Sequence, residues 1–351
     1  MLYCGTLKDS QTEVFSIIGD EEMKLEDIGF YTLEDKRAEN VSVKSPLWRC
    51  ELLLTDRCNF RCPYCRGFKP EYRGDLKTER AINTINMWAR DGLKNIRFSG
   101  GEPTLHGDLP YLVKYARDCG IKRVALSTNG SRPLSEYINL FLSGVNDFSI
   151  SFDACCSSTA SIMSGGQGES MFYSIKENIK ALSKLTYVTL GVVLNERNIS
   201  ELPDIVKTAY EMKVSDVRII TASQSTLIPE INIPEKFLDK FPILRYRVLN
   251  YQSSRDVRGI KNSDSHRCNL VLDDMAIAGE YHFPCIIYFR EHGDPIGKVG
   301  NIHKMRQDRL LWALTHNTYA DPICSKNCLD VCVDYNNKVR ELNKIPEVQK
   351  W

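Results

Sequence analysis

Short apolar runs of strand length alternate with longer amphipathic segments from residue 50 to about residue 222. The runs predict six strands, over residues 50–55, 95–99, 123–127, 147–152, 187–194 and 216–220. The segments between them predict helices that begin near Thr78, Asp108, Pro133, Phe172 and Ser200. Such alternation implies an α/β fold with a parallel sheet and right-handed crossovers. It fits a barrel or an open doubly wound sheet equally well.

Three cysteines follow the first apolar run, at the spacing C-x3-C-x2-C: Cys58, Cys62 and Cys65. In a parallel sheet this loop lies at the carboxyl end of a strand, where active sites are found. Three thiolates suit an iron–sulfur cluster or a zinc ion. Structural zinc normally has a fourth ligand nearby, and no further cysteine follows within fifty residues. A four-iron cluster held by three cysteines leaves one iron open to a substrate or cofactor, whereas a zinc loop remains the alternative.

The cysteine spacing, together with Tyr64 before the third cysteine, resembles the radical S-adenosylmethionine (radical SAM) superfamily. A second motif strengthens the resemblance, because Ser99-Gly100-Gly101-Glu102-Pro103 closes the second predicted strand. The resemblance implies a (β/α)6 partial TIM barrel over residues 47–225. It also implies a [4Fe–4S] cluster on the three cysteines, whose open iron binds SAM.

The resemblance also predicts which residues bind SAM at the strand ends. Paired glycines allow close approach of a ligand, and Glu102 offers an acceptor to the SAM ammonium group. Taken singly, most of these polar residues are typical of turns and caps, but they recur at consecutive strand ends. The predicted cofactor-binding residues are Tyr64 beside the adenine, Gly100, Gly101, Glu102, Pro103, Ser127, Thr128, Asn129, Ser151, Asp153 and Asn195.

A second group of cysteines lies near the C-terminus: Cys268, Cys285, Cys324, Cys328 and Cys332. Their spacing, C-x10-G-x5-C followed by C-x3-C-x3-C, resembles the SPASM/twitch extension that carries auxiliary clusters. The usual first element has one residue fewer after the glycine, and the full extension has two more cysteines. We therefore expect one auxiliary [4Fe–4S] cluster, with Cys268, Cys285, Cys328 and Cys332 as its ligands and Cys324 either a ligand or spare. A zinc knuckle is the alternative.

Cys155 and Cys156 come just after the fourth predicted strand. Thiols at that position would face a substrate and donate a hydrogen atom to a substrate radical, as in epimerases that the chain resembles. The alternative is that they are simply small buried residues without a chemical role.

The remaining segments complete the predicted organisation. Residues 1–46 are interpreted as an N-terminal cap with a strand near residues 13–18. Residues 226–265 contain several prolines and a polar run, which predicts a linker with one short helix. Residues 266–351 are predicted to form a small cysteine-rich auxiliary-cluster domain.

Charge and composition restrict the partners and the compartment. The chain has 46 Lys and Arg against 45 Asp and Glu, a net charge of +1, which gives no broad footprint for nucleic acid or an anionic membrane. It shows no secretory signal and no apolar run long enough for a membrane span. Thirteen cysteines without a signal favour metal sites and reduced thiols, so we expect a cytoplasmic, oxygen-sensitive protein.

The resemblance implies an enzyme that reductively cleaves SAM to a 5′-deoxyadenosyl radical and abstracts hydrogen from its substrate. A reductase of the flavodoxin or ferredoxin type would supply the electron. We expect a small polar metabolite of the sugar, aminocyclitol or nucleoside type, in natural-product or modified-metabolite biosynthesis, with net oxidation favoured over epimerisation. A ribosomal peptide or protein side chain is the first alternative, and a non-catalytic metal-binding scaffold is the second.

Overall fold

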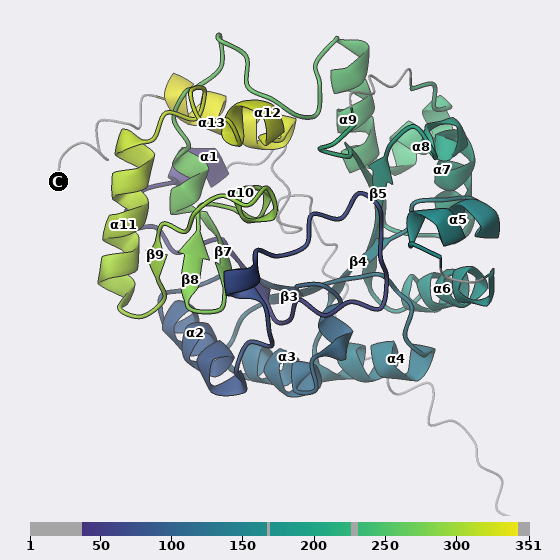
Figure 1. Ribbon diagram of the computed structural model, residues 1–351, viewed down its shortest axis with the longest axis horizontal. Helices are drawn as coiled ribbons and strands as arrows, with labels where there is room; N and C mark the ends of the chain where they lie inside the picture. The colour runs from purple at the N-terminus through teal and green to yellow at the C-terminus, as the bar shows by residue number, and fades with distance from the viewer. Residues whose placement is uncertain (1–36, 167–168, 226–230, 343–351) are drawn as a thin grey trace, which may run out of the picture.

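The computed structural model describes residues 37–166, 169–225 and 231–342. Its centre is a curved sheet of nine strands in the order β6-β5-β4-β3-β2-β1-β7-β8-β9 (Figure 1). The first six strands are parallel and neighbour one another in chain order, as in a partial barrel. They are β1 (Arg49–Leu53), β2 (Asn95–Ser99), β3 (Arg123–Thr128), β4 (Asp147–Ser151), β5 (Tyr187–Leu194) and β6 (Asp216–Thr221). The six predicted strands are therefore confirmed, to within two residues at each end.

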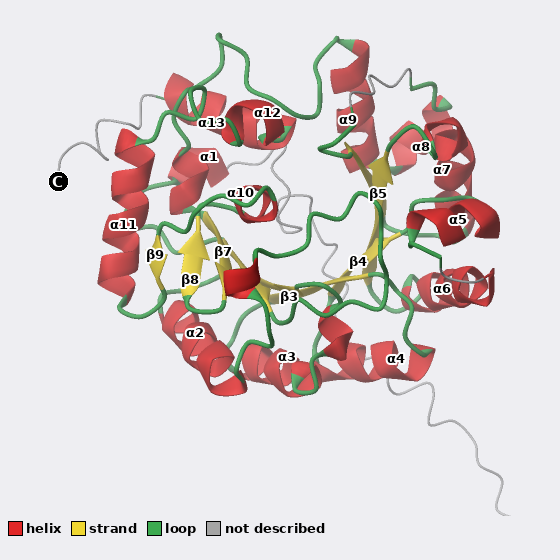
Figure 2. Cartoon of the chain, in the orientation of Figure 1, coloured by secondary structure: helices red, strands yellow, loops and turns green. Residues whose placement is uncertain are grey.

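Helices cover the outer face of this sheet (Figure 2). They are α2 (Thr78–Arg90), α3 (Leu109–Asp118), α4 (Leu134–Ser143), α6 (Glu169–Leu182) and α7 (Leu202–Glu211), with a short extra helix, α5 (Ser157–Met163). Their apolar faces pack on outward-facing strand residues, such as Phe98 and Phe148, in one continuous core. Burial of this apolar surface is what fixes each helix against the sheet.

The inner face of the sheet is polar. Pairing between strands places Glu51 of β1 beside Arg97 of β2. Arg97 and Arg123 both form ion pairs with the buried carboxylate of Asp147 on β4. Because charged groups line the inner face, the concave side of the sheet offers a polar site and not an apolar core.

The C-terminal residues extend the same sheet. Strand β7 (Asp274–Ala278) pairs in parallel with β1, and Arg49 reaches across to the carboxylate of Asp274. Strands β8 (Tyr281–Phe283) and β9 (Gly297–Lys298) follow in antiparallel order. Around them lie η6 (Asn269–Leu272), α10 (Ile286–Arg290), α11 (Ile302–Thr315), α12 (Cys324–Asn327) and α13 (Asp330–Glu341). The segment predicted as a separate small domain thus shares its hydrogen-bonded sheet with the barrel.

The segment interpreted as a linker contains two helices where one was expected, α8 (Glu235–Lys240) and α9 (Pro242–Gln252). Leu244 and Val248 of α9 are buried in the main core, and α9 packs on β6. This burial holds α9 against the barrel. Of the N-terminal segment, the structure describes α1 (Arg37–Asn40), while the strand expected near residues 13–18 lies outside the described residues.

Among the helices of the described residues, none combines the length and apolar composition needed to cross a membrane.

Candidate active site

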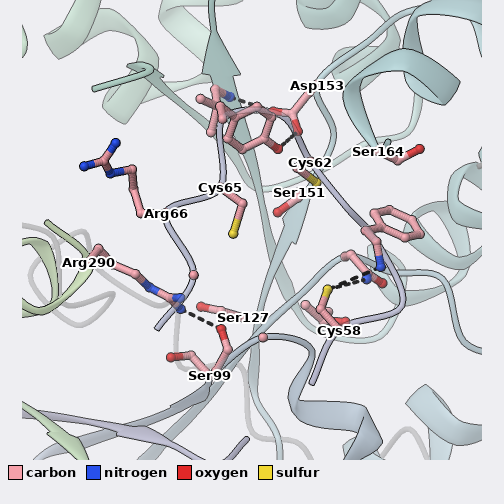
Figure 3. Close-up of a pocket in the computed structure, with 18 of the residues that line it drawn as sticks. Cys58, Cys62, Cys65, Arg66, Ser99, Ser127, Ser151, Asp153, Ser164 and Arg290 are labelled. Carbon is pink, nitrogen blue, oxygen red and sulfur yellow. Dashed lines mark hydrogen bonds between the residues drawn. The ribbon is translucent and has the colours of Figure 1, made fainter. Parts of the chain in front are cut away.

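A cavity of about 1280 Å³ opens at the carboxyl ends of the barrel strands (Figure 3). Its wall brings together the cysteine loop after β1 and the ends of the next strands. Of the residues predicted from the sequence, it is lined by Cys58, Cys62, Tyr64, Cys65, Gly100, Gly101, Ser127, Thr128, Asn129, Ser151 and Asp153. Glu102, Pro103 and Asn195 do not belong to the lining. Three thiols and a set of polar groups thus face one space of ligand size.

The two glycines hold the cysteine loop against the end of β2. The Gly101 amide donates to the Thr55 carbonyl at 2.6 Å, and the Glu102 amide donates to the Arg57 carbonyl at 2.7 Å. A Cβ atom on Gly100 would lie 2.4 Å from the Thr55 carbonyl oxygen, and one on Gly101 would lie 2.3 Å from that of Arg57. The glycines are therefore required where two segments of backbone meet, a reason that the motif alone did not reveal.

The spacing of the three thiols does not suit a single ion. Among the described residues, no Cys58, Cys62 or Cys65 sulfur belongs to a group of three donor atoms within 4.8 Å of one another. Tetrahedral zinc, with Zn–S of about 2.3 Å, would require sulfurs roughly 3.8 Å apart. A cluster attaches its thiolates to separate irons and so holds them farther apart. The donor set fits an iron–sulfur cluster better than zinc.

Burial favours the protonated form of the Cys58 and Cys62 thiols in the absence of metal. Burial raises the pKa of Cys62 to about 12 and also raises the pKa of Cys58. A bound metal would replace the proton and remove this cost. Arg290 donates to the Gly100 carbonyl at 2.6 Å (Figure 3), and it is near enough to Cys65 and Cys58 for their charges to interact. Its guanidinium is positioned to balance the negative charge of bound thiolates.

The Glu102 carboxylate was expected to face the SAM ammonium group, but it contacts other groups of the protein. Its side chain is fully buried, and its carboxylate accepts hydrogen bonds from the Thr104 amide and hydroxyl, the Thr128 hydroxyl and the Asn129 amide. Burial raises the pKa of Glu102, and these donors oppose the rise. With four donors around it, the carboxylate ties the end of β2 to the end of β3 and does not face the cavity.

Tyr64 and Asp153 form a pair across the cavity wall. The Tyr64 hydroxyl donates to Asp153 Oδ2 at 2.5 Å, and the Val193 amide donates to Asp153 Oδ1 at 2.6 Å. Burial raises the pKa of Asp153 to about 6. The pair fixes the cysteine loop to the end of β4, while the Tyr64 ring remains part of the cavity wall.

Asn129 reaches the cysteine loop from the end of β3. Its side-chain amide donates to Asn59 Oδ1 at 2.8 Å. Ser127 accepts from Arg97 at 3.0 Å. By contrast, the Asn195 side chain accepts from the Arg197 amide at 2.9 Å and lies outside the lining, as a turn residue would.

Cys155 and Cys156 do not line the cavity. The loop turns after Ala154, so that Cys155 packs against the main core and Cys156 lies beside Ser158 and Glu201. The hypothesis that they donate hydrogen to a substrate radical therefore lacks its geometric basis. The turn that carries them away could not be seen in the sequence pattern.

The second cysteine group lines one small cavity of about 40 Å³. All five sulfur-bearing residues contribute to it: Cys268, Cys285, Cys324, Cys328 and Cys332. Burial raises the pKa of Cys268 to about 11, and its charged form is further disfavoured by the neighbouring Cys332. Five partly buried cysteines around one cavity fit a soft metal group bound through thiolates.

One short helix separates the two cavities. Ile287 of α10 lines both the large cavity and the small one, and Cys285 caps the start of this helix. Arg258, Arg290 and Glu291 also reach the large cavity from segments beyond the barrel strands. These three residues could not be predicted from the sequence, because no local pattern connects them to the strand ends.

The fold and the site together define an α/β partial-barrel protein with a cysteine-lined cavity at the carboxyl ends of its strands. Residues 52–209, a little under half of the chain, match the model of the Radical SAM superfamily. This match implies a [4Fe–4S] cluster and SAM as cofactors of the matched part.

Curated relatives match over the barrel. GTP 3′,8-cyclase of Tolumonas auensis is 33% identical over 145 residues, 40% of this chain and 42% of the relative. Fe-coproporphyrin III synthase of Methanosarcina barkeri is 29% identical over 226 residues, 61% of this chain and 50% of the relative. The aligned part of the chain thus spans about half the length of these relatives or less.

Two solved structures share the fold over most of the chain. Streptococcus suis SuiB bound to precursor peptide SuiA has a TM-score of 0.56 at 15% identity, covering 82% of this chain and 68% of that one. The structure of anSMEcpe with bound AdoMet has a TM-score of 0.54 at 13% identity, covering 87% of this chain and 99% of that one. At such identities the likeness shows the fold alone.

Proposed function

We propose that the chain is a radical SAM enzyme that removes a hydrogen atom from a small, negatively charged metabolite. One observation carries this proposal: three thiols and the polar ends of four barrel strands line the same cavity. When bound, the cluster and SAM supply one-electron chemistry that removes hydrogen from an unactivated C–H bond. The protein holds the reacting carbon in place and excludes competing hydrogen donors.

Each residue group has a distinct part in the proposal. Cys58, Cys62 and Cys65 hold the cluster, and Arg290 balances its charge. The side chains of Asn129 and Asp153 support the loop from two strand ends, through Asn59 and Tyr64. Glu102 acts as a positioning residue, because its carboxylate holds the backbone on which Asn129 is placed.

The charge of the cavity favours an anionic substrate. Six arginines line it: Arg57, Arg61, Arg66, Arg73, Arg258 and Arg290. Arg57 and Arg66 form ion pairs with Asp75 and Glu291, and Arg290 is assigned to the cluster, which leaves Arg61, Arg73 and Arg258 for a substrate. Arg258 donates to the carbonyls of Thr221 and Asn327 and forms no ion pair within 4.0 Å among the described residues. A phosphate or carboxylate suits such a guanidinium.

The arginines discriminate among the expected substrate classes. Aminocyclitols are cations and would be repelled, and uncharged sugars gain nothing from the arginines. The comparisons give no support to either class. A nucleotide remains as the preferred candidate, and the related GTP 3′,8-cyclases are named for a substrate of this class.

The second cysteine cavity supports one auxiliary [4Fe–4S] cluster as a further part of the proposal. Cys324 lies within 4.8 Å of donor atoms of His316 and Asp321, which turns it toward them. The proposed ligands are therefore the other four cysteines: Cys268, Cys285, Cys328 and Cys332. With only α10 between the cavities, an electron acceptor there favours net oxidation, with a flavodoxin or ferredoxin type reductase supplying electrons to the first cluster.

The test is formation of 5′-deoxyadenosine from SAM by the reconstituted protein with dithionite. Wild type and Cys119→Ala should form it, because Cys119 follows α3 on the outside of the barrel and its thiol donates to Asn86 Oδ1, away from the cavity. Cys62→Ala should not. Equal background product from all three proteins would overturn the assignment.

The substrate class has its own test. Adding nucleotides should increase 5′-deoxyadenosine formation more than adding the matching uncharged nucleosides. Arg258→Ala should reduce that difference while leaving product formation without substrate unchanged. A precursor peptide that stimulates, where nucleotides do not, would favour the peptide alternative.

A further inference from the structure

Cys155 and Cys156 form a compact donor cluster with Glu201, away from the cavity. The two sulfurs and a Glu201 carboxylate oxygen all lie within 4.8 Å of one another, and each of the three side chains is half-buried. Cys156 Sγ is 3.8 Å from Glu201 Oε1. Two segments that are distant in the sequence therefore bring three metal-binding groups to one point.

The Glu201 carboxylate is held in place before any metal binds. Its Oε2 accepts from the Cys155 amide at 2.9 Å, and its Oε1 accepts from the Thr159 hydroxyl. Asn198 adds a buried connection between the same two segments, because its side-chain amide donates to the carbonyls of Asp153 and Val193 at 2.8 and 2.9 Å. A donor set that is already arranged needs little reorganisation to bind an ion.

We propose that Cys155, Cys156 and Glu201 bind a divalent zinc ion, separate from both iron–sulfur sites. Two thiolates and a carboxylate are ligands that zinc accepts in tetrahedral geometry, and the half-exposed position leaves the fourth place to water. Binding displaces the protons of the two thiols to solvent, with no change of oxidation state. The donor atoms of Cys155, Cys156 and Glu201 lie closer together than the sulfurs of Cys58, Cys62 and Cys65, as binding of a single ion requires.

The position suggests what the ion does. Cys155 follows Asp153 and Ala154, which line the large cavity, and Glu201 precedes α7. An ion between them fastens the loop after β4 to the loop after β5. It would therefore stabilise the part of the cavity wall that carries Asp153.

The experiment measures zinc on the full chain with its iron–sulfur sites loaded. After incubation with one equivalent of Zn²⁺ and removal of unbound metal, elemental analysis should give one zinc per chain with iron unchanged. X-ray absorption spectroscopy at the zinc edge should show two sulfur ligands at about 2.3 Å and two oxygen ligands at about 2.0–2.2 Å. Four sulfur neighbours would place the zinc in the C-terminal cysteine cavity and overturn the proposal.

Variants separate this site from the others. Cys155→Ser combined with Cys156→Ser should lose the zinc, whereas Cys119→Ser should retain it. Glu201→Gln keeps an acceptor for the Cys155 amide and should fold, yet bind zinc about tenfold more weakly or worse. Iron content and 5′-deoxyadenosine formation report on the proposed function independently. Zinc retained in the double variant, or absent from wild type, would refute the inference.

Discussion

Replacing Glu102 by alanine distinguishes a ligand-binding carboxylate from a positioning one. The structure gives its carboxylate four donors, two of them the backbone amides of Thr104 and Asn129. In Glu102→Ala the hydroxyl donors can rotate to other partners, but the two amides lose their acceptor. A buried unsatisfied donor costs about 1–3 kcal/mol, so the expected loss of stability is about 2–6 kcal/mol.

The assay is urea unfolding under anaerobic conditions, with the dissociation constant of SAM measured on the same preparations. Glu102→Gln should lose less stability than the alanine variant, because its amide oxygen keeps part of the donor set. Glu136→Ala is the matched control, since Glu136 forms a partly exposed ion pair with Arg132 worth about 0–1 kcal/mol. If Glu102→Ala unfolded like wild type but bound SAM more weakly, the carboxylate would contact the SAM ammonium, as the motif predicted, and the structural account would be wrong.

Three further predictions concern other parts of the chain. Burial raises the pKa of Asp216 from 3.8 to about 7, so the folded state holds this proton more tightly than the unfolded state does. The free energy of unfolding should therefore fall as the pH rises from about 4 to about 7. Urea unfolding midpoints should fall less steeply with pH in Asp216→Asn than in wild type, and an equally steep fall would contradict this. Gly101→Ala should lose stability and first-cluster iron because its Cβ meets the Arg57 carbonyl, whereas Gly107→Ala has nothing within 4 Å and should match wild type. Cys328→Ser should lose about half of roughly eight irons per chain, while Cys324→Ser should keep them; equal loss would make Cys324 a ligand.

The barrel strands were predictable because each carries its own local signal. Residues 95–99 and 187–194 were expected as strands and are strands, since strands covered by helices read as short apolar runs. Helix α9 was harder to predict. Its buried positions include Arg247, which pairs with Asp330 on α13, so the apolar pattern is interrupted by a charge whose partner lies 83 residues away.

The candidate site, like the fold, was predictable where the signal is local and not where it depends on residues distant in the sequence. The three cysteines and the serines at the strand ends could be located because the end of a strand can be read locally. The role of Glu102 could not, because its donors Thr128 and Asn129 come from another strand. The displacement of Cys155 and Cys156 from the cavity likewise depends on a turn and on Glu201, 45 residues beyond Cys156.

The pairing of β7 with β1 has a consequence for synthesis of the chain. Arg49 and Asp274, which bridge the two strands, are separated by 225 residues. At about 5–20 residues per second, roughly 10–45 s pass between synthesis of the two strands. During that time one edge of β1 has unpaired backbone groups, and such an edge can pair with another chain. Nascent chains are therefore expected to be most prone to aggregation before residue 278 leaves the ribosome, whatever the stability of the finished sheet.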